Sequence, residues 1–114
     1  MTHVIIGSTL IPAEVFGIER DRDWNYRHTK SVKCNLTYEE AKSLFVDGVE
    51  WSQIYQGPDY TNEQGDVVKP EPVVTDNSEF DQVMSITENR DGTVTVKMGV
   101  TTAEEINAIL MGGI

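Results

Sequence analysis

The chain is poor in cysteine: Cys34 is the single one among 114 residues. One cysteine cannot form a disulfide within the chain, so a small secreted fold built on disulfides is excluded. A lone thiol is typical of a protein from a reducing compartment. We interpret Cys34 as a small core residue.

Long hydrophobic runs are also missing. The apolar run Val4–Ile6 is far shorter than the apolar region of a signal peptide or a membrane span. We therefore expect a protein that is not secreted by a signal peptide and does not bind a membrane. Its expected location is the cytosol or a particle that carries it.

Basic residues are scarce, with 9 Lys/Arg against 19 Asp/Glu and a net charge of −10. Residues 36–114 hold four Lys/Arg and fifteen Asp/Glu, whereas residues 1–35 hold five Lys/Arg and four Asp/Glu. An acidic surface repels phosphate groups, so we expect no direct binding to nucleic acid. The same surface favours basic protein partners.

Residue types for catalysis or metal binding are few. His28 and Cys34 lie six residues apart on one predicted strand, roughly 20 Å at the rise of a strand, too far to act as base and nucleophile. The acidic segment 76–81 places Phe80 where a calcium loop needs an oxygen ligand. We therefore expect no catalytic residue, no metal ligand and no cofactor, and the chain is predicted not to be an enzyme.

The stretch 26–56 reads as strand, capped helix and strand. Alternation over 26–34 predicts a strand whose second face contacts water, because that face is fully polar: Arg27, Thr29, Ser31 and Lys33. Alternation over 49–56 predicts a second strand with Trp51 and Tyr55 on one face, in the core. Trp24 and Tyr60 lie in predicted loops, where we expect exposed aromatic side chains.

Two short helices are predicted, at about 37–47 and 102–111. Thr37 and Glu40 have the spacing of a capping box. Gly48 predicts the end of the first helix, because glycine adopts the left-handed conformation without steric cost. The stretch Thr102–Ile106 repeats the same pattern of a threonine followed by acids and an apolar stripe.

Hairpins account for most of the remaining chain. Strands at 3–6 and 9–11 flank a turn at Gly7-Ser8, and Pro12 predicts an edge or a bend. Strands at 81–88 and 93–98 flank a turn that ends in Gly92. The sequence therefore predicts an α+β fold, mainly an antiparallel sheet of hairpins with two short capped helices.

The chain length predicts one domain, 1–114, with an acidic loop region at about 57–78 that contains proline and glycine. Long loops in small domains are often functional. We predict that acids in and beside this region contact a partner, together with two exposed aromatics. The predicted partner-binding residues are Asp59, Tyr60, Glu63, Asp66, Glu71, Glu79, Asp81 and Trp24.

Two passages carry a family resemblance. The first combines Thr29–Val32, Leu36–Ala41 and Trp51-Ser52, and the second combines Asp76–Glu79 with Arg90–Gly99. They resemble small proteins encoded by phages and prophages of Gram-positive bacteria, often near tail and host-lysis genes. The resemblance implies a phage setting, in the host cytoplasm or the virion, and a role without catalysis.

These observations favour a small acidic phage protein that binds protein, as an accessory of the virion tail or its assembly. Strands that can pair between subunits make a homo-oligomer possible. The alternative is an inhibitor of bacterial antiviral defence, comparable to an anti-CRISPR protein that mimics DNA and occupies the basic channel of a host nuclease. The segment 59–91 motivates this alternative, because it holds nine acids against Lys69 and Arg90.

Overall fold

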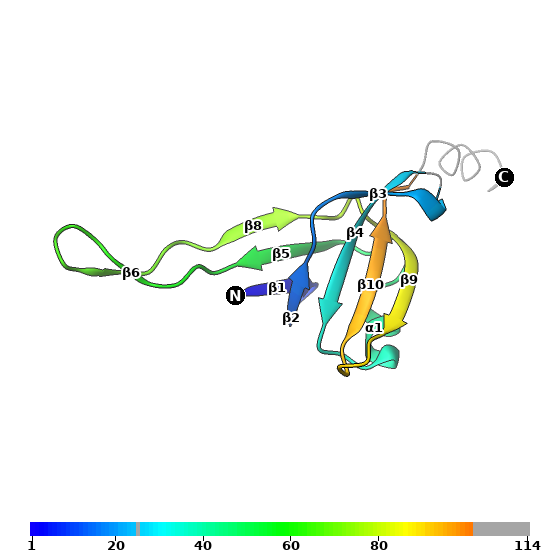
Figure 1. Cartoon of the computed structure of the whole chain (residues 1–114), viewed down its shortest axis with the longest axis horizontal. Helices are drawn as coiled ribbons and strands as arrows, with labels where there is room; N and C mark the ends of the chain where they lie inside the picture. Colours follow the sequence, from blue (N-terminus) through cyan, green and yellow to red (C-terminus); the bar gives the residue numbers. More distant parts are fainter. Residues whose placement is uncertain (25, 102–114) are drawn as a thin grey trace.

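A computed structural model describes residues 1–24 and 26–101 of the chain (Figure 1). In this part the elements are, in order, β1 (Thr2–Ile6), β2 (Thr9–Val15), β3 (Glu19–Asp21), η1 (Arg22–Trp24), β4 (Arg27–Cys34), α1 (Tyr38–Leu44), β5 (Trp51–Tyr55), β6 (Tyr60–Thr61), β7 (Val67–Val68), β8 (Val73–Asp76), β9 (Gln82–Glu88) and β10 (Val94–Gly99). The described residues contain one α-helix. The second predicted helix, at 102–111, lies outside them.

One large sheet dominates the fold, with the strand order β8-β5-β1-β2-β4-β10-β9 and β3 paired to β4. Every pairing in it is antiparallel. The sheet changes direction at Pro12: β2 pairs with β1 through residues 9–12 and with β4 through residues 13–15. The coarser part of the predicted class, an α+β fold that is mainly antiparallel sheet, is confirmed, whereas the described residues contain only the first of the two predicted helices.

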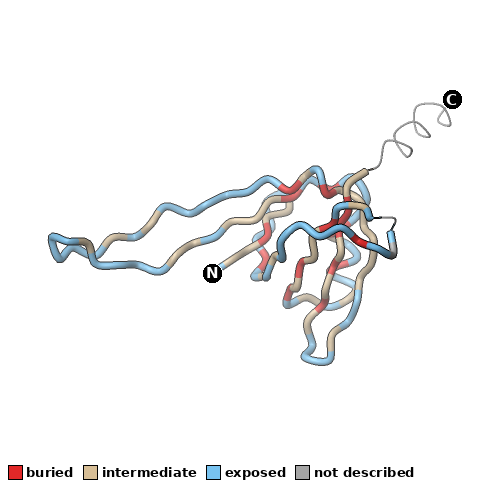
Figure 2. The backbone as a smooth tube through the Cα atoms, turned by 45° about the horizontal axis from the view of Figure 1, so that its top comes forward, coloured by how far each residue is buried: buried red, intermediate tan, exposed pale blue. Residues whose placement is uncertain are grey.

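The two halves of the bent sheet enclose one core. We call the bent sheet, together with α1 and the core between them, the body. Figure 2 shows that the buried residues gather in the body. The core consists of Val4, Ile11, Val32, Cys34, Ala41, Phe45, Val49, Trp51, Phe80, Val94, Val96 and Met98. Helix α1 closes one end of it, since Ala41 is buried against the strands. Burial of this apolar area is the main driving force that holds the bend.

Helix α1 begins at its predicted cap. The Thr37 hydroxyl accepts a hydrogen bond from the Glu40 amide, and the Glu40 carboxylate accepts one from the Thr37 amide. The prediction that the helix continues to Gly48 is wrong. The chain leaves the helix at Phe45, whose φ of −91° and ψ of 95° are extended. This turns the buried Phe45 ring edge-on to Trp51, at 6.2 Å between centroids.

Two side chains differ from the predicted faces. Thr29 was expected to contact water but is 1% exposed, because strands flank it on both sides, with Glu19 of β3 and Gly99 of β10 as its partners. Tyr55 was expected in the core but is 47% exposed. Tyr55 is the last residue of β5, still paired with Thr2 of β1, and its neighbour in β8, Val73, is itself exposed, so neither side chain is covered by the core.

The hairpin of β9 and β10 matches its prediction. Gly92 has a φ of +87°, the conformation that the turn requires of glycine. Val94, Val96 and Met98 alternate into the core. A bulge between Lys97 and Met98 shifts the register with β9.

Candidate functional site

A long β-hairpin projects from the body, and Figure 1 shows it extending to the left beyond β5 and β8. The described chain has a Cα radius of gyration of 17.0 Å, against ~13 Å for a compact domain of about 100 residues. We call residues 55–75 the arm. From its base to its tip the arm spans about eight residues, or roughly 25 Å at the rise of a strand.

The arm has a defined conformation of its own. Strands β6 and β7 pair through Tyr60–Val68 and Thr61–Val67. At the tip, the Asn62 side-chain oxygen accepts hydrogen bonds from the amides of Gln64 and Asp66. These local bonds hold the tip turn closed without help from the body.

The base of the arm is fastened to the body by Asn77, which is fully buried. Its side-chain oxygen accepts a hydrogen bond from Lys30 of β4, and its side-chain NH₂ donates one to Gln53 of β5 at 2.9 Å. The Asn77 amide donates to the Trp51 carbonyl, and the Trp51 indole donates to the Phe80 carbonyl. Asn77 therefore joins both halves of the bent sheet at the point where β8 ends.

The arm leaves its large apolar side chains in water. None of its residues is buried (Figure 2). Tyr55, Tyr60, Val67, Val73 and Val74 are between 47% and 74% exposed. An exposed apolar surface of this kind, on an element that adds nothing to the core, is the usual mark of a contact with another molecule.

Five of the predicted partner-binding residues lie on the arm. They are Asp59, Tyr60, Glu63, Asp66 and Glu71, and all five are exposed. Glu79 and Asp81 lie beyond the base, in the connection from β8 to β9, and Asp81 accepts a hydrogen bond from the Thr101 hydroxyl at 2.7 Å. Trp24 lies in η1 on the body, so the structure does not bring it to the arm.

Sequence reasoning missed four exposed apolar residues of the arm: Tyr55, Val67, Val73 and Val74. Tyr55 was assigned to the core from its alternation with Trp51. The signal that was available is the pair Val73-Val74, which places apolar side chains on both faces of one strand although the flanking sequence is polar. Because β8 lies outside the core, the side chains on both of its faces remain exposed.

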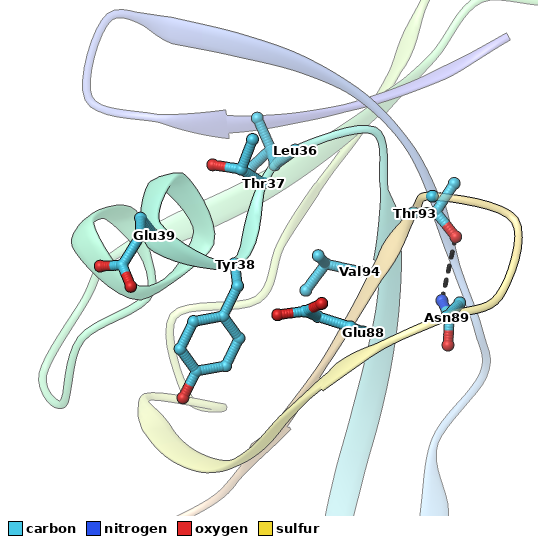
Figure 3. Close-up of a pocket in the computed structure, with 9 residues that line it drawn as sticks. Leu36, Thr37, Tyr38, Glu39, Glu88, Asn89, Thr93 and Val94 are labelled. Atoms are coloured by element: carbon cyan, nitrogen blue, oxygen red, sulfur yellow. Dashed lines mark hydrogen bonds between the residues drawn. The ribbon is translucent and has the colours of Figure 1, made fainter.

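A second candidate is a pocket of about 420 Å³ between the start of α1 and the hairpin of β9 and β10 (Figure 3). Part of its polar lining is already engaged within the protein. Thr37 caps the helix, and the Thr93 hydroxyl accepts a hydrogen bond from Asn89 at 2.9 Å. Glu39 and Glu88 are the carboxylates of the pocket, and neither histidine nor cysteine lines it. The pocket therefore offers less to a ligand than the arm.

Other chemistry has little support in the described part of the chain. Its residues contain no group of three or more His, Cys, Asp or Glu that could hold a metal ion. In the acidic segment 76–81, the Asp76 carboxylate accepts hydrogen bonds from the Ser78 hydroxyl and amide, which lower the pKa of Asp76. Burial raises the pKa of the Cys34 thiol to about 11, which suppresses its reactivity.

Among the described residues, no helix is both long and apolar enough to span a membrane. Comparison with protein-family models, curated proteins and solved structures gave no match. The function is therefore inferred from the residues and geometry of the chain itself.

Proposed function

We propose that this protein acts by binding another protein through the arm, without catalysing a reaction. One observation carries the proposal: the arm extends from the body, is held in a fixed shape by its own hydrogen bonds, and exposes apolar side chains that no part of the described chain covers. A hairpin of this kind presents both its side chains and its strand edge to a partner.

The proposed setting is a phage virion, with the protein as an accessory of the tail or of tail assembly. The resemblance described above supports this setting. The arm adds support, because particle assembly joins many protein subunits and a projecting hairpin can reach a neighbouring subunit. The expected locations are the virion and the host cytoplasm in which it is assembled.

The second candidate remains an inhibitor of a host defence nuclease that mimics the phosphates of DNA. The acids of the arm favour it: Asp59, Glu63, Asp66 and Glu71 stand against Lys69, a balance of −3 for residues 55–75. Charge on an exposed hairpin can enter the basic channel of such an enzyme. The exposed apolar side chains of the arm favour a role in virion assembly, whereas its exposed acids favour mimicry of DNA. Experiment can separate these two functions.

The first experiment compares the natural chain with an arm-truncated variant, in which Asn-Gly replaces Pro58–Lys69. This replacement suits the structure because a Cβ on Gly57 would lie 3.4 Å from the Pro70 ring across the hairpin. Asn-Gly is the favoured two-residue turn between paired strands. Both tagged proteins are used to capture partners from the cells that produce them, and the partners are identified by mass spectrometry.

The proposal predicts that the natural chain captures virion tail or baseplate proteins and that the arm-truncated variant does not. Equal capture by both proteins would contradict the proposed role of the arm. Capture of a host nuclease, without virion proteins, would favour the second candidate.

Two further variants separate apolar contact from charge mimicry on the same hairpin. The first carries Tyr60→Ser, Val67→Ser and Val74→Ser; the second carries Asp59→Lys, Glu63→Lys and Asp66→Lys. Assembly predicts that the apolar variant loses more binding and that salt has a small effect. Mimicry predicts the reverse, with an affinity that falls steeply as ionic strength rises.

A further inference from the structure

Strand β8 forms one edge of the large sheet, at the base of the arm. In the described part of the chain it pairs with β5 alone, in the register from Ser52–Asp76 to Tyr55–Val73. Figure 1 shows β8 along the outside of the molecule, and Figure 2 shows that its residues are exposed. An uncovered edge strand presents a row of backbone donors and acceptors to another chain.

The pairing with β5 fixes which backbone groups of β8 point away from the sheet. The Asn77 amide donates a hydrogen bond to the Trp51 carbonyl at 2.9 Å, so the backbone of Asn77 faces β5. Along an antiparallel strand, residues that face one neighbour alternate with residues that face away from it. Thr75 therefore faces β5, whereas the N–H and C=O groups of Val74 and Asp76 point outward.

The opposite edge of the sheet, at β9, is covered by the chain itself. The Val83 amide donates a hydrogen bond to the Asp47 carboxylate at 2.9 Å, and the Gly48 amide donates one to the Asp81 carbonyl at 2.7 Å. Asp47 and Gly48 both follow α1, so the chain beyond the helix lies along the start of β9. Natural sheets protect their edges in this way. The described residues place no such cover on β8, and this contrast favours β8 as a place for another strand.

Acidic side chains flank the edge at β8. Residues 70–79 hold Glu71, Asp76 and Glu79 and no Lys or Arg, and with Lys69 included the balance is −2. Lys30, which reaches the base of β8, is already engaged in a hydrogen bond there. The edge therefore attracts cationic side chains of a partner. A second copy of the same edge would instead bring these acids close to their own equivalents, which is unfavourable.

We propose that β8 accepts an extended segment of a basic partner protein as an additional strand. The inference rests on the proposed function, because it names the way in which the base of the arm binds that protein. Backbone hydrogen bonds to Val74 and Asp76 hold the added strand. The flanking acids and the exposed side chains of Val73 and Val74 select a segment that carries basic and apolar residues.

This edge is one part of the whole contact. Pro72 has no N–H, so the row of outward donors ends at Val74. Such a short edge holds a short strand, and the exposed side chains of Tyr60 and Val67 on the outer arm supply further contacts. The arm-truncated variant therefore keeps the β8 edge and loses the contacts of the outer arm.

The test uses a defined probe, a seven-residue peptide with capped ends that alternates lysine and valine. The same peptide with glutamate in place of lysine is the control for charge. Binding to the full chain is followed by NMR up to about 1 mM peptide, where a contact with a Kd of about 1 mM is still visible. The exchange of each backbone amide with deuterium is measured in the same samples.

We expect the lysine peptide to bind and to slow the exchange of the outward amides of Val74 and Asp76. At a peptide concentration of about ten times the Kd, that exchange should slow about tenfold. The amides of the outer arm, residues 60–68, should exchange as before. The glutamate peptide should bind at least about tenfold more weakly, because its charge has the same sign as that of the edge.

Two variants of one residue separate the backbone of the edge from its side chain. Val74→Pro removes the outward N–H without removing a hydrogen bond to β5, whereas Val74→Ala shortens the side chain and keeps the N–H. Both variants have the charge of the natural chain. We expect peptide binding to fall far more in Val74→Pro than in Val74→Ala. A protected Thr75 amide in Val74→Pro shows that β8 still pairs with β5.

Several results would overturn the inference. They are a lysine peptide that does not bind up to about 1 mM, binding that leaves the exchange of Val74 and Asp76 unchanged, and equal binding by Val74→Pro with β8 still paired. Protection of these two amides that rises with protein concentration, in the absence of peptide, would identify a second copy as the occupant and would also overturn it. The exchange measurement on the natural chain needs no variant, so it decides even if Val74→Pro does not fold.

The proposed function fails by a different result, namely partner capture that does not depend on the outer arm. We expect the arm-truncated variant to bind the lysine peptide as the natural chain does, because it retains β8, and yet to capture no partner. Capture that is lost on truncation but equal in Val74→Pro and Val74→Ala would retain the function and contradict this inference.

Discussion

Lys30 and Asn77 lie 47 positions apart in sequence, and the Lys30 ammonium donates a hydrogen bond of 2.5 Å to the Asn77 side-chain oxygen. Lys30 belongs to β4, and Asn77 follows β8 directly. The ammonium also lies 5.2 Å from the centre of the Phe80 ring. This hydrogen bond therefore joins β4 of the body to the residue that follows β8 at the base of the arm.

Replacement of Asn77 tests how much this hydrogen bond contributes to stability. Asn77→Ala removes the partner of the Gln53 side chain and of the Lys30 ammonium, both of which are partly buried, and the loss of such a hydrogen bond costs up to about 1–3 kcal/mol when the group left behind is buried. We expect a loss of that order in the free energy of unfolding, measured by urea denaturation. Lys30→Met alone should cost less, and the double variant should lose less than the sum of the two; strict additivity would show that the pair is not coupled.

The helix cap gives a second prediction. Thr37→Ala removes the oxygen that accepts from the Glu40 amide, and loss of such a cap costs about 1 kcal/mol. Lys42→Ala is the matched control, because Lys42 is exposed on the same helix and differs little from alanine in helix propensity. Thermal unfolding should separate the two variants, and an equal effect would contradict the role of the cap.

Cys34 gives a prediction about reactivity and pH. Its thiol is buried and has a pKa of about 11, against 9.0 when exposed, so a thiol reagent at pH 8 should modify the chain only as it unfolds. Between these two values the unfolded thiol ionises while the folded one stays neutral. The contribution of Cys34 to stability is therefore complete below pH 9 and falls as the pH rises toward 11. Fast labelling under native conditions would contradict the burial.

The arm-truncated variant should remain folded. No residue of the arm is buried, so its removal takes no side chain from the core. We expect a melting temperature within a few degrees of the natural chain, whereas Phe45→Ala, which removes a buried ring, should cost about 3–5 kcal/mol. A large loss of stability on truncation would assign the arm a structural role.

Local chemistry made much of the fold predictable from sequence. The capping box at Thr37, the turn at Gly92 and the bend at Pro12 each depend on neighbouring residues, and each is found where the sequence places it. The end of α1 was not predictable in this way. At that end Phe45 packs edge-on against Trp51 of β5, a tertiary contact that the local sequence does not reveal.

The candidate site was predictable in part. The acids of the segment 57–78 were recognised, but its proline and glycine content suggested a loop instead of a projecting hairpin. Because side chains alternate along a strand, Trp51 and Tyr55 lie on the same face of β5. Trp51 is nevertheless buried in the core, whereas Tyr55, at the end of the strand, is exposed. Where a sheet stops being covered is a property of the whole fold, so Tyr55 was assigned to the core although it is exposed.

The most direct test of the account is photo-crosslinking from the arm of the full chain. A photoreactive phenylalanine analogue replaces Tyr60 on the arm or, as the control, Lys42, which is exposed on α1. We expect position 60 to form a crosslink to a protein partner and position 42 to form none. Crosslinks from position 42 with none from position 60 would show that the protein binds through its body, and would contradict the central role of the arm.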